Sequence, residues 1–390
     1  MNEAVIVDAV RSPMGRGKAG GALSSVHPSD LLAAILKGLV ARNGIDPGEV
    51  DDVIVGCVSQ VGEQSATPGR MAWLSAGFPA HVPATTIDRK CGSSQQAVHF
   101  AAQGIMAGAY DMVIAAGIES MSRIPLGSAR MGQDYHGPSV TRRYAPGLVS
   151  QGVAAELVAG KWGLSRDDLD RYSAQSHIRA AGACAAFEAE IVPIATEAGE
   201  VRADETIRPQ TTAERLGELK TVFGTPDMIE RFPEIDWKVT AGNSSQITDG
   251  AAGLLIMSAA RAKALGLRPR ARFVAFDVVG DDPMMMLTAP IPAARRALAR
   301  AGLGIGDIAH YEVNEAFASV PLAWAKELGA DPARLNPCGG AIALGHPLGA
   351  TGTRLMTTML HALERTGGRY GLQAVCEAGG MANATIIERL

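Results

Sequence analysis

The segment NPCGGAIALGHPLGATG, residues 336–352, places one histidine among small, apolar and glycine residues. Seven of its seventeen residues are glycine or proline, which disfavours a helix or strand through most of it and predicts a tight turn around His346. From Leu348 the spacing of apolar residues becomes helical and ends at Gly367 and Gly368, as at a helix C-terminus. His346 is therefore expected on a loop just before a helix, either as a packed loop residue or as a base.

Short apolar runs alternate with helical patterns along much of the chain, which is typical of an α/β protein. Strands are predicted at 4–10, 51–58, 84–90, 111–118, 251–258, 271–279, 308–313 and 370–378. Helices are predicted at 28–43, 66–77, 92–108, 291–302 and 315–328. The order of elements recurs: the strands beginning at 53 and 308 are 255 positions apart, and so are Cys91 and His346. This spacing indicates two similar halves.

Residues 120–249 differ in texture from both halves, because they are polar, rich in turn residues and without clear periodicity. Long irregular insertions in compact folds are more often functional than idle, so this segment is predicted to be a lid or loop domain. The predicted domains are residues 1–119 with 250–269, the loop domain 120–249, and residues 270–390.

The composition describes a soluble globular protein, with 47% hydrophobic and 19% charged residues. A net charge of −4 gives no general reason to expect a nucleic acid or a membrane as partner. The five cysteines are scattered without a CxxC pair, which favours free thiols over disulfides or a metal site. No signal peptide or membrane-spanning stretch is recognisable, so the cytoplasm is the expected location.

Three further residues could carry chemistry, and each has a plain alternative. Cys91 stands where a strand ends and a helix begins; a helix N-terminus can stabilise a thiolate, although a small buried side chain is an equally good interpretation. Cys376 ends a strand before Gly379 and Gly380, so it could line a cleft beside a hairpin turn. Asn314 lies between a strand and a helical pattern, where an N-cap is the favoured interpretation.

Taken together, four segments resemble the thiolases, coenzyme A-dependent enzymes that make or break the carbon–carbon bond of a 3-ketoacyl thioester. These segments are the one around Cys91, NEAFA at 314–318, GGAIALGHPLGATG at 339–352 and CEAGGMAN at 376–383. Their order and spacing agree as well as their residues, and the resemblance covers essentially the whole chain. It implies a five-layer αβαβα core of two similar halves with an inserted loop domain that binds coenzyme A.

The resemblance also implies roles for these residues. Cys91 would be the nucleophile that carries the acyl group, His346 its base, and Cys376 the acid that protonates the enolate of acetyl-CoA. His346 with a water held by Asn314 would form one oxyanion hole, and the backbone N–H groups of Cys91 and Ala378 the other. Glu315 would orient the residues around these oxyanion holes, unless it is a solvated surface carboxylate.

Coenzyme A or acetyl-CoA would be a substrate rather than a permanently bound cofactor. By resemblance Lys220, Ser245, Ala316 and Phe317 would contact coenzyme A, and Met286 would line the acyl pocket. The assembly would be a homodimer or homotetramer. Departures from the family pattern are Ala378, which would be strained at a positive φ, Cys338, Lys90, and Ser150 to Gly152 in place of a His-Met-Gly. The last of these puts short-chain specificity in doubt.

The pieces DRKCGSSQQA, GGRYGLQAVCEAGGMAN and SQGVAAE look closest to actinobacterial thiolases of fatty-acid or steroid-ring breakdown, which favours thiolysis in catabolism. A biosynthetic acetoacetyl-CoA thiolase is the alternative within the family. Outside it, a ketoacyl-synthase-like condensing enzyme would generally lack the second cysteine, and a non-catalytic acyl-CoA carrier would be expected to lose at least one of the four groups.

Overall fold

The computed structural model describes residues 2–390; Met1, the first residue of the first predicted domain, lies outside them. The strands of the described chain are β1 (Ala4–Arg11), β2 (Gly15–Arg16), β3 (Asp52–Gly56), β4 (Ala84–Ile87), β5 (Met112–Ser120), β6 (Ile194–Thr196), β7 (Gly199–Val201), β8 (Thr248–Ser258), β9 (Ala271–Gly280), β10 (Ile308–Val313), β11 (Tyr370–Glu377) and β12 (Met381–Arg389). The helices are α1 (Pro28–Asn43), α2 (Pro68–Ser75), α3 (Ser93–Met106), α4 (Gly137–Arg143), α5 (Gln151–Lys161), α6 (Arg166–Phe187), α7 (Ala213–Gly217), α8 (Pro226–Arg231), α9 (Ala259–Ala264), α10 (Pro290–Ala301), α11 (Ser319–Leu328), α12 (Ala341–Leu344) and α13 (Thr351–Thr366).

Within residues 2–390, ten strands form one continuous sheet whose two halves, which we call the first and second sheets, have matching topology, and β6 and β7 pair as a separate two-stranded sheet. In the first half β4, β3 and β5 run parallel, and β8 and β1 continue the sheet antiparallel. In the second half β10 and β11 run parallel, and β12 and β9 continue antiparallel. An isolated parallel bridge between Tyr311 and Leu335 takes the place that β4 holds in the first half. The predicted duplication is confirmed by this equivalence.

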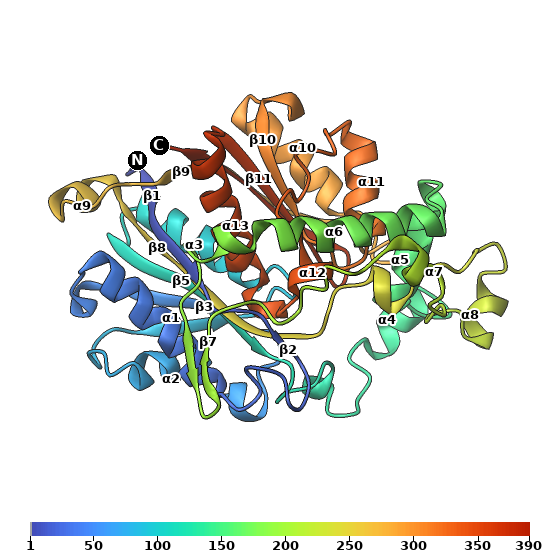
Figure 1. Cartoon of the computed structure of the whole chain (residues 1–390), viewed down its shortest axis with the longest axis horizontal. Coiled ribbons are helices and arrows are strands. Elements are labelled where there is room, and N and C mark those ends of the chain that lie inside the picture. The colour runs from blue at the N-terminus through green and yellow to red at the C-terminus, as the bar shows by residue number, and fades with distance from the viewer. Residues whose placement is uncertain (1) are drawn as a thin grey trace.

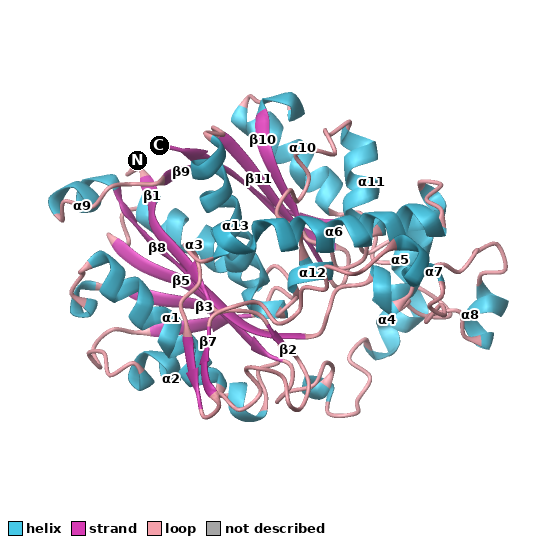
Figure 2. Ribbon diagram, in the orientation of Figure 1, coloured by secondary structure: helices cyan, strands magenta, loops and turns pink. Residues whose placement is uncertain are grey.

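Helices complete the layers seen in Figures 1 and 2. α3 and α13 pack against each other and against strands of both sheets, so they form the central layer. Met356, Met359, Leu360 and Leu363 of α13 meet the apolar side chains of β1, β5, β8 and α3 in one buried cluster. α1 and α2 cover the outer face of the first sheet, and α10 covers that of the second. The predicted five-layer α/β core is therefore correct.

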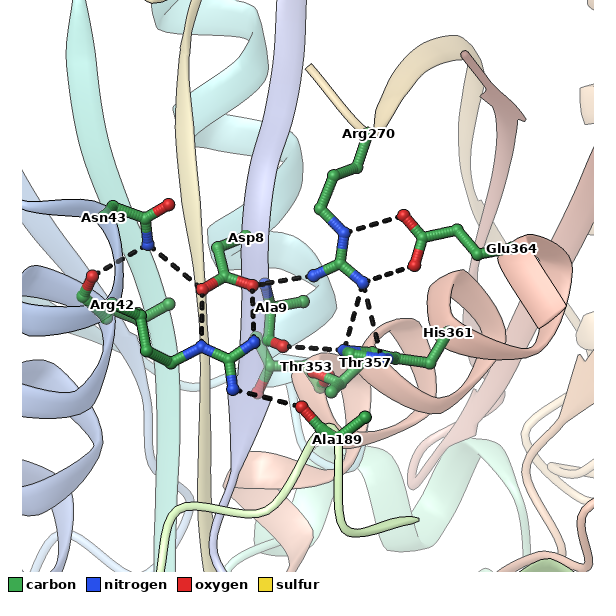
Figure 3. A network of polar contacts seen from close by, with 11 residues as sticks. Asp8, Ala9, Arg42, Asn43, Ala189, Arg270, Thr353, Thr357, His361 and Glu364 are labelled. Carbon is green, nitrogen blue, oxygen red and sulfur yellow. Dashed lines mark hydrogen bonds and ion pairs between the residues drawn. The ribbon is translucent and has the colours of Figure 1, made fainter. Parts of the chain in front are cut away.

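The two sheets meet where β1 pairs with β9 through Val5 and Ile6. Beside this seam Arg270 donates to Asp8 of β1 at 2.7 Å and to Glu364 of α13 at 2.8 Å (Figure 3). Arg42 of α1 donates to the same Asp8 at 2.9 Å. A partly buried ion-pair network thus ties an outer helix, the seam strand and a central helix together.

The segment 120–249 is more regular than the sequence indicated. It contains α5 and the 22-residue α6. In Figure 1 α4, α5, α7 and α8 lie on the right, and α6 runs from there across the middle of the molecule. α6 begins at a capping box in which Ser165 and Asp168 exchange hydrogen bonds. The expected irregularity is thus wrong for 151–187. No helix in the described part of the chain has both the length and the apolar character needed to cross a bilayer.

Candidate active site

His346 lies on the predicted loop, with a three-residue 3₁₀ turn between it and α13. The backbone before it is fixed by Gly345, whose φ of 93° and close approach to Thr248 leave no room for a side chain: a Cβ there would lie 2.1 Å from Thr248 Oγ1. The N–H of His346 donates to Gln246 O and to Thr248 Oγ1, both at 3.1 Å. The loop is therefore anchored to the chain entering β8.

The hydrogen bonds of the His346 ring define which nitrogen carries the proton. Nδ1 lies 2.6 Å from Thr351 Oγ1, and that hydroxyl donates to Pro347 O at 3.0 Å. Because the Thr351 hydroxyl proton is donated to Pro347 O, the hydroxyl oxygen must accept from Nδ1–H. Nε2 is then the unprotonated nitrogen, which can accept a hydrogen bond. Nε2 faces the Asn314 amide, whose Nδ2 donates to it at 3.4 Å. Burial, and after it the charge of Arg354, lowers the pKa of His346 to about 3, so the ring is neutral and its lone pair lies on Nε2.

Asn314 is fully buried between β10 and α11, and its backbone N–H donates to Ala374 O of β11 at 3.0 Å. The N-cap interpretation is wrong, because α11 begins later, at Ser319, with Ala318 at the cap. The predicted helix start at 315 is also wrong: Ser245 N donates to Ala316 O, and Phe317 bridges Ser244. Asn314 Oδ1 has no protein partner among the described residues, so it is free to hold a water or a substrate atom.

Glu315, the next residue, is buried and accepts four hydrogen bonds. Tyr172 and Ser176 of α6 each donate to it at 2.8 Å, while Asn336 Nδ2 and Ile342 N each donate at 3.0 Å. Burial raises the pKa of Glu315, and these donors oppose that shift. The alternative of a solvated surface carboxylate is wrong, and the side chain instead connects α6 to the loop that leads to His346.

Cys91 and Cys376 come from different halves and meet in the interior. Cys91 is 5% exposed and packs with Leu355 and Val375, the latter being the neighbour of Cys376, which is 1% exposed. Burial, and after it the nearby Cys376 and Glu377, raises the pKa of Cys91 well above its ordinary value. Burial and Glu377 raise the pKa of Cys376 to about 12. Burial thus outweighs the helix N-terminus, and both resting thiols keep their protons.

The two halves approach closely at this point. Gly349, three residues after His346, lies against the ends of β3 and β5; a Cβ on it would be 2.7 Å from Ile118 O and 2.8 Å from Gly56 O. The buried Glu119 of β5 accepts from Gly349 N at 2.9 Å and from Val58 N at 3.0 Å. The histidine loop of the second half is therefore fastened to the strand ends of the first half.

The residues expected at the second oxyanion hole and along coenzyme A lie at several places in the fold. Ala378 does not have a positive φ; the hairpin turn uses Gly379 (φ 96°) and Gly380 (φ 80°) instead, so the expected strain at Ala378 does not arise. Ser245, Ala316 and Phe317 are brought together by their backbone contacts. Lys220 is exposed on the segment 120–249.

Met286 is 6% exposed and shares an apolar cluster with Cys376, Ala316 and Phe317. Cys338 is buried and accepts from Arg365 at 3.3 Å, and Lys90 takes a positive φ of 49° while pairing with Asp88 at 2.7 Å.

Sequence reasoning missed Thr351, Glu119 and Phe223. Thr351, the first residue of α13, carried a weak signal as a hydroxyl five positions after a candidate base. The ring of Phe223 stacks edge-on to Phe317 with centroids 6.1 Å apart, and it covers Gly152, where a Cβ would lie 2.2 Å from it. The ring leaves no room for a side chain at position 152, which explains the glycine there. No local sequence pattern connects Phe223 with Gly152 or Phe317.

Comparison with known proteins agrees with this geometry. The family model described as thiolase, N-terminal domain, matches residues 4–260, and the model described as thiolase, C-terminal domain, matches residues 267–389. The chain belongs to the thiolase family. It is 50% identical to the steroid 3-ketoacyl-CoA thiolase FadA6 of Mycobacterium tuberculosis, over 100% of this chain and 95% of that protein. It is 44% identical to a 3-ketoacyl-CoA thiolase of Erwinia tasmaniensis over the full length of both chains.

A solved thiolase-family structure also matches. The crystal structure of the Bacillus anthracis acetyl-CoA acetyltransferase superposes with a TM-score of 0.87 at 36% identity, over 100% of this chain and 99% of that one. The thiolase family, expected from four short segments, is therefore confirmed along the whole chain.

Proposed function

We propose that this thiolase cleaves a 3-ketoacyl-CoA with coenzyme A, yielding acetyl-CoA and a shortened acyl-CoA, in the breakdown of fatty acids or steroid rings. The observation that carries the proposal is a pair of buried, neighbouring thiols, Cys91 and Cys376, one from each half. It is supported by a neutral His346 hydrogen-bonded to Asn314, whose amide oxygen has no partner among the described residues. The degradative direction and the substrate class are supported by the names of the two relatives above, both 3-ketoacyl-CoA thiolases.

The protonation states define the order of events. The lone pair of neutral His346 lies on Nε2, so Nε2 exchanges its long contact with Asn314 for the proton of Cys91 before the sulfur attacks the ketone carbonyl; the transient thiolate and imidazolium stabilise each other. Nε2–H then becomes a donor and, with a water on Asn314, stabilises the oxyanion. Cys376 keeps its proton until the enolate of acetyl-CoA leaves, and protonates it.

The second half of the cycle releases the acyl group. Coenzyme A enters, Cys376 takes the proton of its thiol, and the new thiolate attacks the acyl group on Cys91. The backbone N–H groups of Cys91 and Ala378 serve the thioester oxyanion in this scheme. Ser245, Ala316 and Phe317 line the path of the pantetheine arm, Lys220 meets the nucleotide end, and Met286 lies at the acyl pocket. The segment 120–249 is the loop domain that supplies the coenzyme A contacts.

The test compares two alanine variants by two assays. In Cys376→Ala the nucleophile and its base remain, so acetylation of Cys91 by acetyl-CoA persists in intact-protein mass spectrometry, because a thiolate leaves without an acid. Cleavage of 3-ketoacyl-CoA substrates falls at least about 10²-fold, because the enolate is far more basic and coenzyme A has lost its base. In Cys91→Ala both reactions vanish.

Other outcomes point to other functions. If Cys376→Ala cleaves 3-ketoacyl-CoA at a rate within a few-fold of the parent, Cys376 has no catalytic role and only ends a strand. The favoured function is then that of a single-cysteine condensing enzyme. If the parent binds acyl-CoA but never acetylates Cys91, the chain is a non-catalytic carrier. A panel of acyl-CoA substrates separates acetoacetyl-CoA from longer and steroid-derived chains.

We also propose a homodimer or homotetramer in the cytoplasm. β4 is the outermost strand of its half, and an outer strand with unpaired backbone groups invites pairing with a second copy. The segment 121–147 exposes Leu126, Met131 and Tyr135, apolar side chains of the kind that interfaces cover. Sedimentation of the purified chain distinguishes the two assemblies from a monomer.

A further inference from the structure

Glu377, the residue after Cys376, points its carboxyl group at the backbone that follows the nucleophile. It is fully buried at the end of β11. A Cβ placed on Gly92 would lie 2.0 Å from Glu377 Oε1, so the carboxyl group rests directly against the residue after Cys91, at the N-terminus of α3. Glu377 therefore adjoins both thiols, one through the chain and the other through space.

The hydrogen bonds around Glu377 differ from those of the other two buried glutamates at the site. Glu119 and Glu315 each accept four hydrogen bonds from protein donors, which is the environment of a carboxylate. Glu377 Oε2 has no partner among the described residues. An ionised Glu377 would be a buried charge without the donors that such a charge needs.

The amide of Asn383 lies 2.9 Å from Glu377 Oε1. If the amide nitrogen faces the carboxyl group, it donates to Oε1. If the amide oxygen faces it, two acceptors are in contact unless the carboxyl group carries a proton and donates. The first arrangement tolerates a protonated Glu377, and the second requires it.

The ionisable groups that act on Glu377 come from the loop before α3 and from its own strand. Burial raises the pKa of Glu377 to about 8; the charge of Arg89 lowers it and that of Asp88 raises it. Arg89 Nε is itself buried and has no hydrogen-bond partner in the described part of the chain, and Lys90 pairs with Asp88. Cys91 and Cys376 are the two thiols beside it, and the neighbouring α3 and β12 present uncharged Gln96 and Asn383.

We propose that Glu377 is a positioning residue held as a neutral carboxylic acid beside the two thiols, and that its ionisation opposes formation of the thiolate at Cys91. The inference rests on the proposed roles of Cys91 and Cys376. In the neutral form Glu377 fills the space beside Gly92 without adding negative charge where a thiolate and an enolate must develop. In the ionised form it repels both, so the enzyme loses activity on the alkaline side through a group that is neither nucleophile nor base.

The experiment follows iodoacetamide alkylation of Cys91 by peptide mass spectrometry between pH 6 and pH 10. It compares the wild type, Glu377→Gln and the control Glu327→Gln, which removes an exposed glutamate on α11. Below about pH 8 Glu377→Gln follows the wild type, because Glu377 is neutral there. Above that pH the apparent pKa of Cys91 is lower in the variant by about one unit, which gives up to roughly tenfold more thiolate. Glu327→Gln follows the wild type.

Three results overturn the proposal. One is a Cys91 profile in Glu377→Gln that coincides with the wild type, and another is an equal shift in the Glu327→Gln control. The third needs no variant: the wild-type alkylation rate should rise less than tenfold per pH unit between about pH 8 and 9.5, as Glu377 ionises, so a full tenfold rise refutes it. Glu377→Met provides a second uncharged variant if glutamine disturbs folding.

Failure of the proposed function gives a different signature. Alkylation needs neither substrate nor turnover, so the comparison still reports on Glu377 if acetyl-CoA never acetylates Cys91. Conversely, a normal acyl-enzyme with identical alkylation profiles in wild type and Glu377→Gln would refute the role of Glu377 and leave the thiolase chemistry intact.

Discussion

Replacing Glu315 with glutamine tests whether one carboxylate organises the site. Each of the two carboxylate oxygens of Glu315 accepts two hydrogen bonds. The donors are the hydroxyls of Tyr172 and Ser176, the side-chain amide of Asn336 and the backbone N–H of Ile342. A glutamine has one acceptor oxygen, so its NH₂ must face two donors. If it replaces Oε2, the hydroxyl of Ser176 can turn, but the N–H of Ile342 cannot.

The cost can be estimated from these contacts. A buried donor left unsatisfied costs about 1–3 kcal/mol, and the loss of a charge-assisted hydrogen bond adds about 1 kcal/mol. We therefore expect Glu315→Gln to lower the free energy of unfolding by about 2–4 kcal/mol. For a chain of 390 residues the shift is about 1.2 °C per kcal/mol, so the melting temperature falls by about 2–5 °C.

The assay is thermal unfolding followed by circular dichroism, combined with amide hydrogen exchange of the peptide that carries Ile342. Exchange at Ile342 should accelerate with the loss of stability, because its N–H loses its acceptor. Glu327→Gln is the matched control; it alters only the exposed contacts of Glu327 with Arg295 and Trp162, so it should change the free energy of unfolding by no more than about 1 kcal/mol. A melting temperature within 1 °C of the wild type, with unchanged exchange at Ile342, would refute the reasoning.

Two further predictions concern coenzyme A and acid stability. Replacing Lys220 or Ser245 with alanine should raise the KM for coenzyme A several-fold without changing acyl-chain preference. Added salt should weaken coenzyme A binding if Lys220 contacts a phosphate. A changed chain preference at constant KM would instead assign these residues to the acyl chain. Burial, and after it Arg89, lowers the pKa of His99 to about 3, so the unfolded chain takes up its proton first, and stability present above about pH 6.5 is lost as the pH falls toward 3. His99→Gln, which cannot titrate, should lose about 2 kcal/mol less than the wild type between pH 6.5 and pH 5, as measured by denaturant unfolding at each pH; parallel losses in both proteins would contradict this.

The elements that local periodicity describes were predictable from the sequence. The strand at 308–313 has the predicted bounds, and the helix at 28–43 does as well, because an alternating or helical apolar pattern is a local property. The start of α11 was not predictable: residues 315–318 follow a helical pattern, but Ala316 and Phe317 are held by backbone contacts with Ser245 and Ser244, which are distant in sequence.

The candidate site divides in the same way. Cys91, His346 and Cys376 stand out by residue type at strand and helix ends. The buried glutamates around them, Glu119 and Glu315, do not stand out, because their hydrogen-bond partners are remote in the sequence. Glu119 is 230 positions from Gly349, and Glu315 is 139 positions from Ser176. α6 was missed although its start carries a Ser-x-x-Asp signature, because its apolar residues are mostly alanines and its exposed face is polar.

The close approach of Gly349 to the ends of β3 and β5 limits how this chain can change. Cys91 belongs to the first half and His346 to the second, and the loop after His346 lies so close to the backbone of the first half that no side chain fits at Gly349. A substitution that shifts either half by the width of one methyl group must be matched in the other. The halves can diverge in their outer helices, surfaces and loop insertion, but along this line of contact they are bound to evolve as a single unit.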